Sequence, residues 1–226
     1  MTQQQKAIPS PELEEIRTHL FTALLSDVMD GLGAMHQALP PRVRPLDDAS
    51  IMVGRARTAL FADVYDVATG ENPYENEIRL IDSLRPGDIP VFACGGTGRI
   101  APWGELLSTA AAMRGAAGVL MDGLVRDVRA IRKMGFPVFH GGIGPLDSKG
   151  RGRVISCDVP IECAGVRIRP GDLVFGDADG VVVVPQAIEA QVLQGAYEKL
   201  KGENQTLADL RAGMSLGEVF AKYGVL

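Results

Sequence analysis

The sequence lacks long apolar runs, a leader segment and any block of positive charge. No apolar stretch reaches the ~18 residues that span a bilayer, and the N-terminal MTQQQKAIPSPELEEI has no basic region followed by an apolar one. The 23 Lys and Arg residues are interspersed with 28 Asp and Glu residues, for a formal net charge of −5. This mixture is unlike the basic patches of nucleic-acid binders. We expect a cytoplasmic protein whose partners include neither a membrane nor a nucleic acid.

Cysteine and lysine are also scarce. The three cysteines, Cys94, Cys157 and Cys163, are odd in number and show no CxxC spacing, which argues against a disulfide framework and a zinc knuckle. We expect idle thiols in a reducing compartment. None of the six lysines lies in the glycine-rich loop or at the strand ends considered below. This disfavours a Schiff-base aldolase, which needs a buried, activated lysine.

Segments typical of strands and helices alternate through the middle of the chain. The sequence predicts strands at 51–62, 89–94, 117–123 and 136–142, and helices at 71–84, 104–115 and 125–135. The first of these helices is expected to bury Ile78, Ile81 and Leu84. The alternation predicts an α/β layer with parallel strands. After Ser148, short apolar runs separated by AG, PGD and DADG turns predict a β-rich half that packs on the first.

Helices are predicted near both ends of the chain. The remaining predicted segments are a flexible arm at 1–10, helices at 11–20 and 26–30, and a helical tail at 186–226 with breaks near Gly202 and Gly213. With 46% hydrophobic residues the chain can bury a sizeable core. Its length is near the upper end of one domain or the lower end of two, and we take 1–226 as a single domain.

A glycine-rich loop, GGTGRIAPWG, lies between a predicted strand and a predicted helix. Glycines at that position expose backbone N–H groups at a helix N-terminus, where a carboxylate or phosphate binds well. The candidate cradle consists of Gly96, Thr97, Gly104 and the amides of Leu106 and Leu107. A tight turn that binds no ligand explains the glycines equally well.

Three charged residues accompany this loop. Glu105 opens the helix after it, and Arg126 and Asp127 directly follow the next strand. Ligands bind at the carboxyl ends of strands in open α/β sheets, so the three can face one crevice. Carboxylates with water suit Mg²⁺ or Mn²⁺, and an arginine can hold a substrate carboxylate bidentately. Such a site suits a 2-oxo acid, whose enolate a metal stabilises. The alternatives are a helix-dipole contact for the glutamate and a surface ion pair for the other two.

The segment WGELLSTAAAMRGAAGVLMDGLVRDVRAIRKMGFPVF resembles the signature region of the 4-hydroxy-4-methyl-2-oxoglutarate / 4-carboxy-4-hydroxy-2-oxoadipate aldolase family. This family also includes the regulator of ribonuclease E activity A and proteins once labelled menaquinone methyltransferases. Its aldolase motif is an acid, twenty residues, then Arg-Asp, which here is Glu105-x20-Arg126-Asp127. SDVMDGLG, RPGDIPVF, GDLVFGDADGVVVVP and SLGEVFAKYG extend the resemblance over most of the chain. It implies a layered α/β/β/α domain of the swivelling type, assembled as a homotrimer or homohexamer.

The resemblance also implies a role for each matching residue. Asp127 corresponds to the direct metal ligand, Arg126 to the residue that binds the substrate carboxylate or keto oxygen, and Glu105 to the acid that holds a metal-bound water. Gly104 and the amides of Leu106 and Leu107 correspond to the loop that grips the pyruvate carboxylate. Glu203, in KLKGENQ, is matched to a glutamate that a neighbouring subunit contributes to the metal shell.

Two departures from the family pattern bear on the substrate. Position 105 is Glu where the characterised aldolases often have Asp, and His140-Gly141-Gly142 stands where the family often has Ala-Arg-Gly. The missing arginine leaves the substrate beyond its pyruvyl half open, and we expect the region of His140 and Arg99 to decide it. His140 itself is either a proton carrier or a residue that satisfies local hydrogen bonds.

The implied reaction is a metal-dependent (class II) retro-aldol cleavage. A 4-hydroxy-2-oxo acid, of the 4-hydroxy-4-methyl-2-oxoglutarate or 4-carboxy-4-hydroxy-2-oxoadipate type, would give pyruvate and an oxo acid, with oxaloacetate decarboxylation as a side activity. The alternative is a non-catalytic regulator that binds a ribonuclease, but such regulators lack the full acid and Arg-Asp set. A methyltransferase is disfavoured because CGGTGRIAPWG does not match a G-x-G-x-x-G turn.

Overall fold

The computed structural model describes residues 11–96 and 98–224. The arm predicted at 1–10 lies outside them, as does Thr97 of the candidate cradle. The first elements are α1 (Pro11–His19), α2 (Thr22–Gly31), β1 (Arg44–Pro45), β2 (Met52–Asp63), α3 (Glu75–Asp82), β3 (Asp88–Ala93), α4 (Glu105–Met113), β4 (Val119–Met121), β5 (Leu124–Val125), α5 (Val128–Met134) and β6 (Val138–His140). There follow β7 (Gly142–Ile143), β8 (Gly152–Cys157), β9 (Ile161–Cys163), β10 (Val166–Ile168), β11 (Leu173–Asp177), β12 (Gly180–Val184), α6 (Glu189–Arg211) and α7 (Leu216–Tyr223).

One large sheet organises the molecule. Its strand order is β1-β6-β4-β3-β2-β11-β12, with β8 also paired to β2. The pairs β2–β3, β3–β4 and β4–β6 are parallel, as the alternating sequence predicts, and the strands of the second half are antiparallel. The two ends of the sheet approach each other, because Ala38 pairs with Val182 and Arg44 donates to the carbonyls of Ala178 and Asp179. The sheet is therefore a nearly closed barrel.

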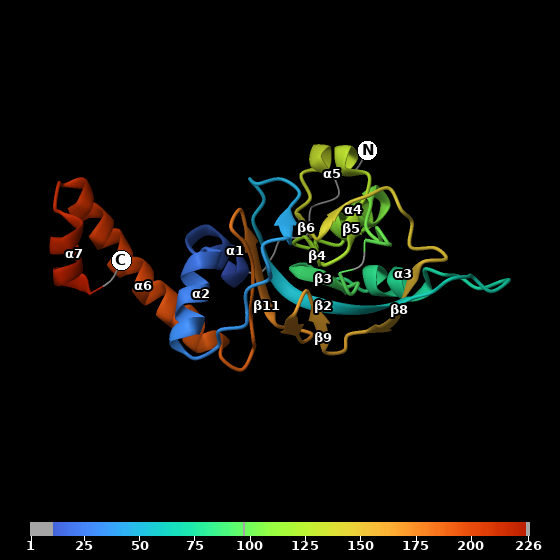
Figure 1. Cartoon of the computed structure of the whole chain (residues 1–226), viewed down its shortest axis with the longest axis horizontal. Helices are drawn as coiled ribbons and strands as arrows, with labels where there is room; N and C mark the ends of the chain where they lie inside the picture. The colour runs from blue at the N-terminus through green and yellow to red at the C-terminus, as the bar shows by residue number, and fades with distance from the viewer. Residues whose placement is uncertain (1–10, 97, 225–226) are drawn as a thin grey trace.

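Helices cover two sides of this barrel (Figure 1). A core cluster that includes Leu24, Phe175 and Val192 joins α1, α2 and α6 to β11 and β12. A second cluster, with Leu80 and Trp103, joins α3, α4 and α5 to the parallel strands. A third fills the space between the strands themselves. The cross-section is α/β/β/α, so the predicted layered fold is confirmed.

The tail is helical, but its break differs from the prediction. α6 runs through Gly202 without interruption and ends at Arg211, so the break predicted at Gly202 is wrong. One glycine costs a helix only about 1 kcal/mol, and its Lys, Glu and Gln neighbours favour the helix. The break at Gly213 is confirmed: this residue has φ 95°, and Ser215 then caps α7. α6 and α7 extend away from the barrel (Figure 1).

The second helix starts one turn earlier than predicted. The carboxylate of Asp177 accepts hydrogen bonds from the amide and the hydroxyl of Thr22, at 2.9 and 2.7 Å. This long-range cap satisfies a free helical N–H and allows α2 to begin at Thr22 rather than Ser26. In the described part of the chain, no helix is long and apolar enough to cross a membrane.

A close approach between β2 and the turn before β3 predicts a stability effect. A Cβ at Gly54 would lie 2.2 Å from the carbonyl oxygen of Gly87, a backbone atom that cannot move aside. We expect Gly54→Ala to lower the free energy of unfolding in urea by about 2 kcal/mol or more. The control is Gly31→Ala in α2, where an added Cβ meets nothing within 4 Å. Equal stability of the two variants would contradict the prediction.

Candidate active site

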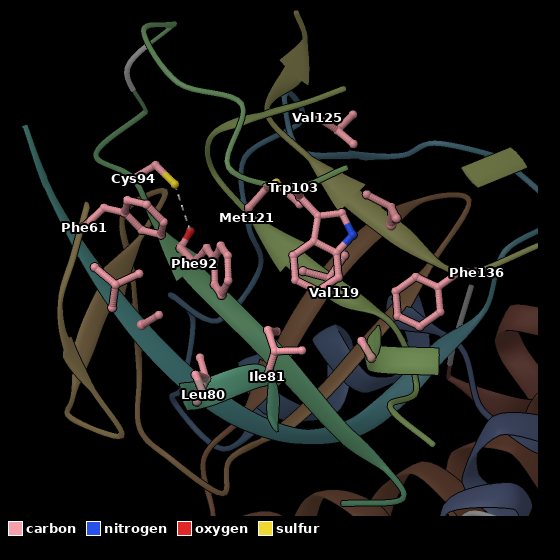
Figure 2. Packing of buried hydrophobic residues seen from close by; sticks show 14 of the residues in the cluster. Phe61, Leu80, Ile81, Phe92, Cys94, Trp103, Val119, Met121, Val125 and Phe136 are labelled. Carbon is pink, nitrogen blue, oxygen red and sulfur yellow. Dashed lines mark hydrogen bonds between the residues drawn. The ribbon is translucent and has the colours of Figure 1, made fainter. Parts of the chain in front are cut away.

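A buried tryptophan anchors the loop between β3 and α4. The ring of Trp103 is fully buried, with its centroid 5.5 Å from that of Phe92 and 6.2 Å from that of Phe136 (Figure 2). Its indole N–H donates to the hydroxyl of Ser108 at 2.7 Å. Its carbonyl accepts a hydrogen bond from the amide of Arg126 at 2.9 Å. The glycine-rich loop and the Arg-Asp pair are therefore held side by side.

The acid, the arginine and the aspartate of the sequence motif meet at the start of α4. Asp127 Oδ2 accepts a hydrogen bond from the amide of Glu105 at 3.1 Å. A Cβ at Gly104 would lie 2.4 Å from that oxygen and 3.2 Å from Cγ of Arg126, so a larger residue there would displace the Asp127 carboxylate. Asp127 has φ 56°, a left-handed conformation that aspartate tolerates better than most residues and that often marks functional sites.

A cavity of about 270 Å³ opens beside these residues. That volume is suited to one small organic acid. Its lining comes from α3, the start of α4, the end of β5 and the loop before β8: Tyr74, Glu77, Ile78, Pro102, Gly104, Leu106, Leu107, Arg126, Asp127, Asp147 and Ser148. Five of the predicted site residues are among them: Gly104, Leu106, Leu107, Arg126 and Asp127.

Two predicted site residues lie elsewhere. Glu105 is outside the cavity lining and lines a shallow hollow that Asp127 and Lys133 also line. Glu203 is on α6, where its carboxylate is 3.8 Å from Lys199 Nζ, in the tail that extends from the barrel (Figure 1). Within one chain, the fold does not bring Glu203 to the cavity.

The other residues considered from the sequence are absent from the cavity's described lining. Gly96 has φ 66° and lies in the loop after β3, outside that lining. His140 is buried in β6, where burial, with Arg132 next, lowers the pKa of its imidazole. Arg99 forms an ion pair with Asp63. Burial raises the pKa of the Cys94 and Cys163 thiols, which agrees with the expectation that they are idle.

One residue of the cavity, a buried glutamate on α3, was not among the site residues predicted from the sequence. Ile78 is 45% exposed, whereas Glu77 is only 4% exposed. The apolar face predicted for α3 is therefore wrong at Ile78. Glu77 shares helical spacing with Leu80, Ile81 and Leu84, all buried. An acid at that place in an apolar stripe was a signal for a functional carboxyl.

The cavity places two carboxyl groups in opposite protonation states. Burial, with ionised Asp147 next, raises the pKa of Glu77 to about 8, although Arg126 opposes the shift. Burial alone would raise the pKa of Asp147. The hydroxyl of Tyr74, 2.6 Å away, and Arg126 Nη2, 3.4 Å away, outweigh it, so that this pKa is lowered. At neutral pH Glu77 is protonated and Asp147 is ionised.

The oxygen donors of the site fit a hard cation. In residues 11–96 and 98–224, no three His, Cys, Asp or Glu side chains converge on one point. Mg²⁺ does not need such a cage, because it keeps several waters and binds through one or two carboxylates. Asp127, exposed at the cavity mouth and held by the amide of Glu105, offers one carboxylate, and Glu105 offers a second on the adjacent side.

The buried glutamate makes the stability of the protein depend on pH. Its pKa is 4.5 ordinarily and about 8 in the folded state, so between those values the unfolded chain loses a proton that the folded chain keeps. Stability is therefore lost as pH rises, on the order of 3–5 kcal/mol by pH 9. We expect Glu77→Gln, which stays neutral, to gain stability relative to wild type between pH 5 and pH 9, measured by urea denaturation. The matched control is Glu75→Gln, an exposed acid on the same helix, and an equal gain there would refute the assignment.

Comparison with known proteins supports one family. The family model described as RraA-like, aldolase/RraA, matches residues 22–183. A Halalkalibacterium halodurans protein provisionally named 4-hydroxy-4-methyl-2-oxoglutarate aldolase is 38% identical over 178 residues, which are 79% of each chain. The crystal structure of an uncharacterized Pseudomonas syringae protein matches with a TM-score of 0.81 at 28% identity, over 94% of this chain and 98% of that one.

A further solved structure represents the regulators in the same family. Streptomyces coelicolor RraAS2, described as an unusual member of the RNase ES inhibitor RraA family, matches with a TM-score of 0.77 at 26% identity. The match covers 88% of this chain and 97% of that one. With a family model over most of its length and these relatives, the chain belongs to the aldolase/RraA family.

Proposed function

We propose that this protein is a divalent-metal-dependent lyase that cleaves a 4-hydroxy-2-oxo acid to pyruvate and a second carbonyl compound. One observation carries the proposal: Arg126 lies in the cavity with its Nε buried and, within the described residues, without a hydrogen-bond partner. A buried, unpaired guanidinium N–H is costly, and an oxygen of a bound acid would satisfy it. 4-Hydroxy-4-methyl-2-oxoglutarate, named for the relative, is the first compound to assay.

The start of α4 and Arg126 together would hold the pyruvyl half. The amides of Leu106 and Leu107 are in the first helical turn, where no preceding carbonyl accepts them, and both residues line the cavity. A carboxylate there also gains from the helix dipole. Arg126 can donate in parallel to the carboxylate and the neighbouring keto oxygen.

Asp127 is the residue that would hold Mg²⁺ or Mn²⁺ directly, and Glu105 would hold a water bound to that ion. When bound, such an ion supplies Lewis-acid polarisation of the 2-oxo group. The hydrogen bond from the Glu105 amide and the left-handed backbone of Asp127 fix the carboxylate in place before any ligand arrives. That preorganisation is the contribution of this chain to cation affinity.

The bond cleavage needs a base and a place for negative charge. As the C4 hydroxyl loses its proton and the C3–C4 bond breaks, the electron pair moves to the pyruvyl oxygen, where Arg126 can stabilise it. Glu105 or a neighbouring subunit's acid would accept the proton. The same charge stabilisation serves loss of CO₂ from oxaloacetate, so we include that decarboxylation as a side activity.

The tail supports a shared site in a homotrimer or homohexamer. Glu203 lies in α6, whose C-terminal part extends with α7 away from the barrel of its own chain (Figure 1). Leu207, Leu216 and Phe220, on the same extension, are each about half exposed. An apolar arm of this kind is typical of a segment that packs on another copy. Glu203 would then complete the metal shell of a neighbouring subunit.

The regulatory function is the second candidate, and the similarity to the RNase ES inhibitor family favours it. Arg126 and Asp127, which line the cavity, and Glu105, whose amide donates to Asp127, are all retained, and this favours the lyase instead. Calorimetry separates the two. Absence of Mg²⁺ and Mn²⁺ binding, together with tight binding of a ribonuclease, would reverse the ranking.

Metal removal provides the direct test. We expect pyruvate release from 4-hydroxy-2-oxo acids to stop in EDTA and to return with excess Mg²⁺ or Mn²⁺. Asp127→Asn keeps an oxygen to accept from the Glu105 amide but loses the charge, and should lower kcat/KM by about 100-fold or more. Asp48→Asn, an exposed acid outside the cavity, is the matched control. Equal rates with the chelator present would exclude the metal route.

The shared site predicts complementation between inactive subunits. Glu203→Gln alone should lower kcat by about tenfold or more while the oligomer, sized by light scattering, stays intact. Co-expression of Glu203→Gln with Asp127→Asn should recover part of the activity, because some sites then combine an intact Asp127 with a neighbour's intact Glu203. No recovery in verified mixed oligomers would place Glu203 outside the site.

A further inference from the structure

The charges around the cavity are uneven. As far as the described residues define it, the lining holds one cation, Arg126, against the carboxyl groups of Glu77, Asp127 and Asp147. The base of the Arg126 side chain adjoins Gly104 and Asp127, and its Nη2 is 3.4 Å from Asp147. The end of the cavity beyond Arg126 is therefore lined by Asp147 and Glu77, and the described residues of this chain add no further positive charge there.

The two carboxyl groups at the acidic end of the cavity are held in place by the surrounding structure. Asp147 accepts a 2.6 Å hydrogen bond from Tyr74, which fixes its carboxylate at the cavity, and Glu77 is only 4% exposed. The raised pKa of Glu77 leaves it neutral at pH 7, able both to donate and to accept a hydrogen bond. Ile78 and Leu106 add apolar surface. This set of groups suits an uncharged fragment bearing a hydroxyl.

A substrate with a second carboxylate would find no favourable partner at the acidic end of the cavity. Its pyruvyl carboxylate already needs Arg126, which Asp147 partly neutralises. A second carboxylate at the far end would face ionised Asp147 at close range without a cation, and like charges in such proximity are strongly disfavoured. Oxaloacetate, itself a dicarboxylate, is expected to bind weakly for the same reason.

We propose that the cavity selects 4-hydroxy-2-oxo acids whose fragment beyond C4 is uncharged, so that the second product is a neutral aldehyde or ketone. This inference rests on the proposed lyase function. In the reaction the C4 hydroxyl gives its proton to a base and the C3–C4 bond breaks. The electron pair passes to the pyruvyl half, and C3 of that half then takes up a proton, which yields pyruvate.

The test compares two substrates of equal chain length on the wild-type protein with Mg²⁺. 4-Hydroxy-2-oxopentanoate releases acetaldehyde, and 4-hydroxy-2-oxoglutarate releases glyoxylate; pyruvate is quantified by chromatography in both. We expect kcat/KM to favour the uncharged substrate by about tenfold or more. Asp147→Asn, which keeps an oxygen for Tyr74, should narrow that ratio by about tenfold, whereas Asp48→Asn should leave it unchanged.

If Asp147→Asn fails to fold, a binding measurement on the wild-type protein still tests the inference. Calorimetry on the wild-type protein should show tighter binding of 2-oxopentanoate than of 2-oxoglutarate, two five-carbon acids that the enzyme cannot cleave. Equal or better cleavage of the dicarboxylate, or tighter binding of 2-oxoglutarate, overturns the inference and leaves the lyase proposal intact. Pyruvate release from neither substrate contradicts the lyase proposal and removes the inference with it.

Discussion

The burial of Trp103 is the constraint on which the candidate site depends. Its ring packs in the core between the parallel strands and α3, α4 and α5 (Figure 2), and its backbone forms a β-bridge with Val125 in β5. One residue thus fixes the end of the glycine-rich loop and the start of the Arg-Asp pair. A second hydrogen bond joins the same two segments, because the amide of Leu124 donates to the carbonyl of Ile100 at 3.1 Å. A loop held by a fully buried indole can expose helix amides to a ligand without becoming loose itself.

The cavity next to this anchor departs from ordinary core packing. α3 presents Glu77 in line with Leu80 and Ile81, at a buried position that apolar residues usually occupy. The carboxyl avoids most of the cost of burial because it stays protonated. Asp147 keeps its charge through Tyr74 and Arg126. Ionisable residues whose burial opposes stability, when they gather around one cavity, are expected at a functional site rather than in a structural core.

Much of the fold and part of the site could be predicted from the sequence, for physical reasons. Short apolar runs that alternate with helical segments predicted the parallel strands and their helices, and the motif Glu105-x20-Arg126-Asp127 predicted which loop and which strand end meet. The Tyr74, Glu77 and Asp147 grouping could not be predicted, because it joins a helix to a loop about seventy residues later through tertiary packing. The early start of α2 depends on Asp177, which is 155 residues away from Thr22 in the sequence. α6 continues past Gly202 because surrounding helix formers outweigh one weak residue.

The two ends of the cavity have opposite electrostatic character, and this asymmetry constrains how a ligand can lie. Near the start of α4, exposed amides, the helix dipole and Arg126 attract negative charge. Near α3, Asp147 repels it, and the neutral Glu77 can only exchange hydrogen bonds. Under the proposed function, a 2-oxo acid with one carboxylate would therefore have a single favourable orientation, with its 2-oxo group beside Asp127. Orientation of this kind reduces the entropic part of a reaction barrier, and it is obtained here from fixed charges rather than from a close steric fit.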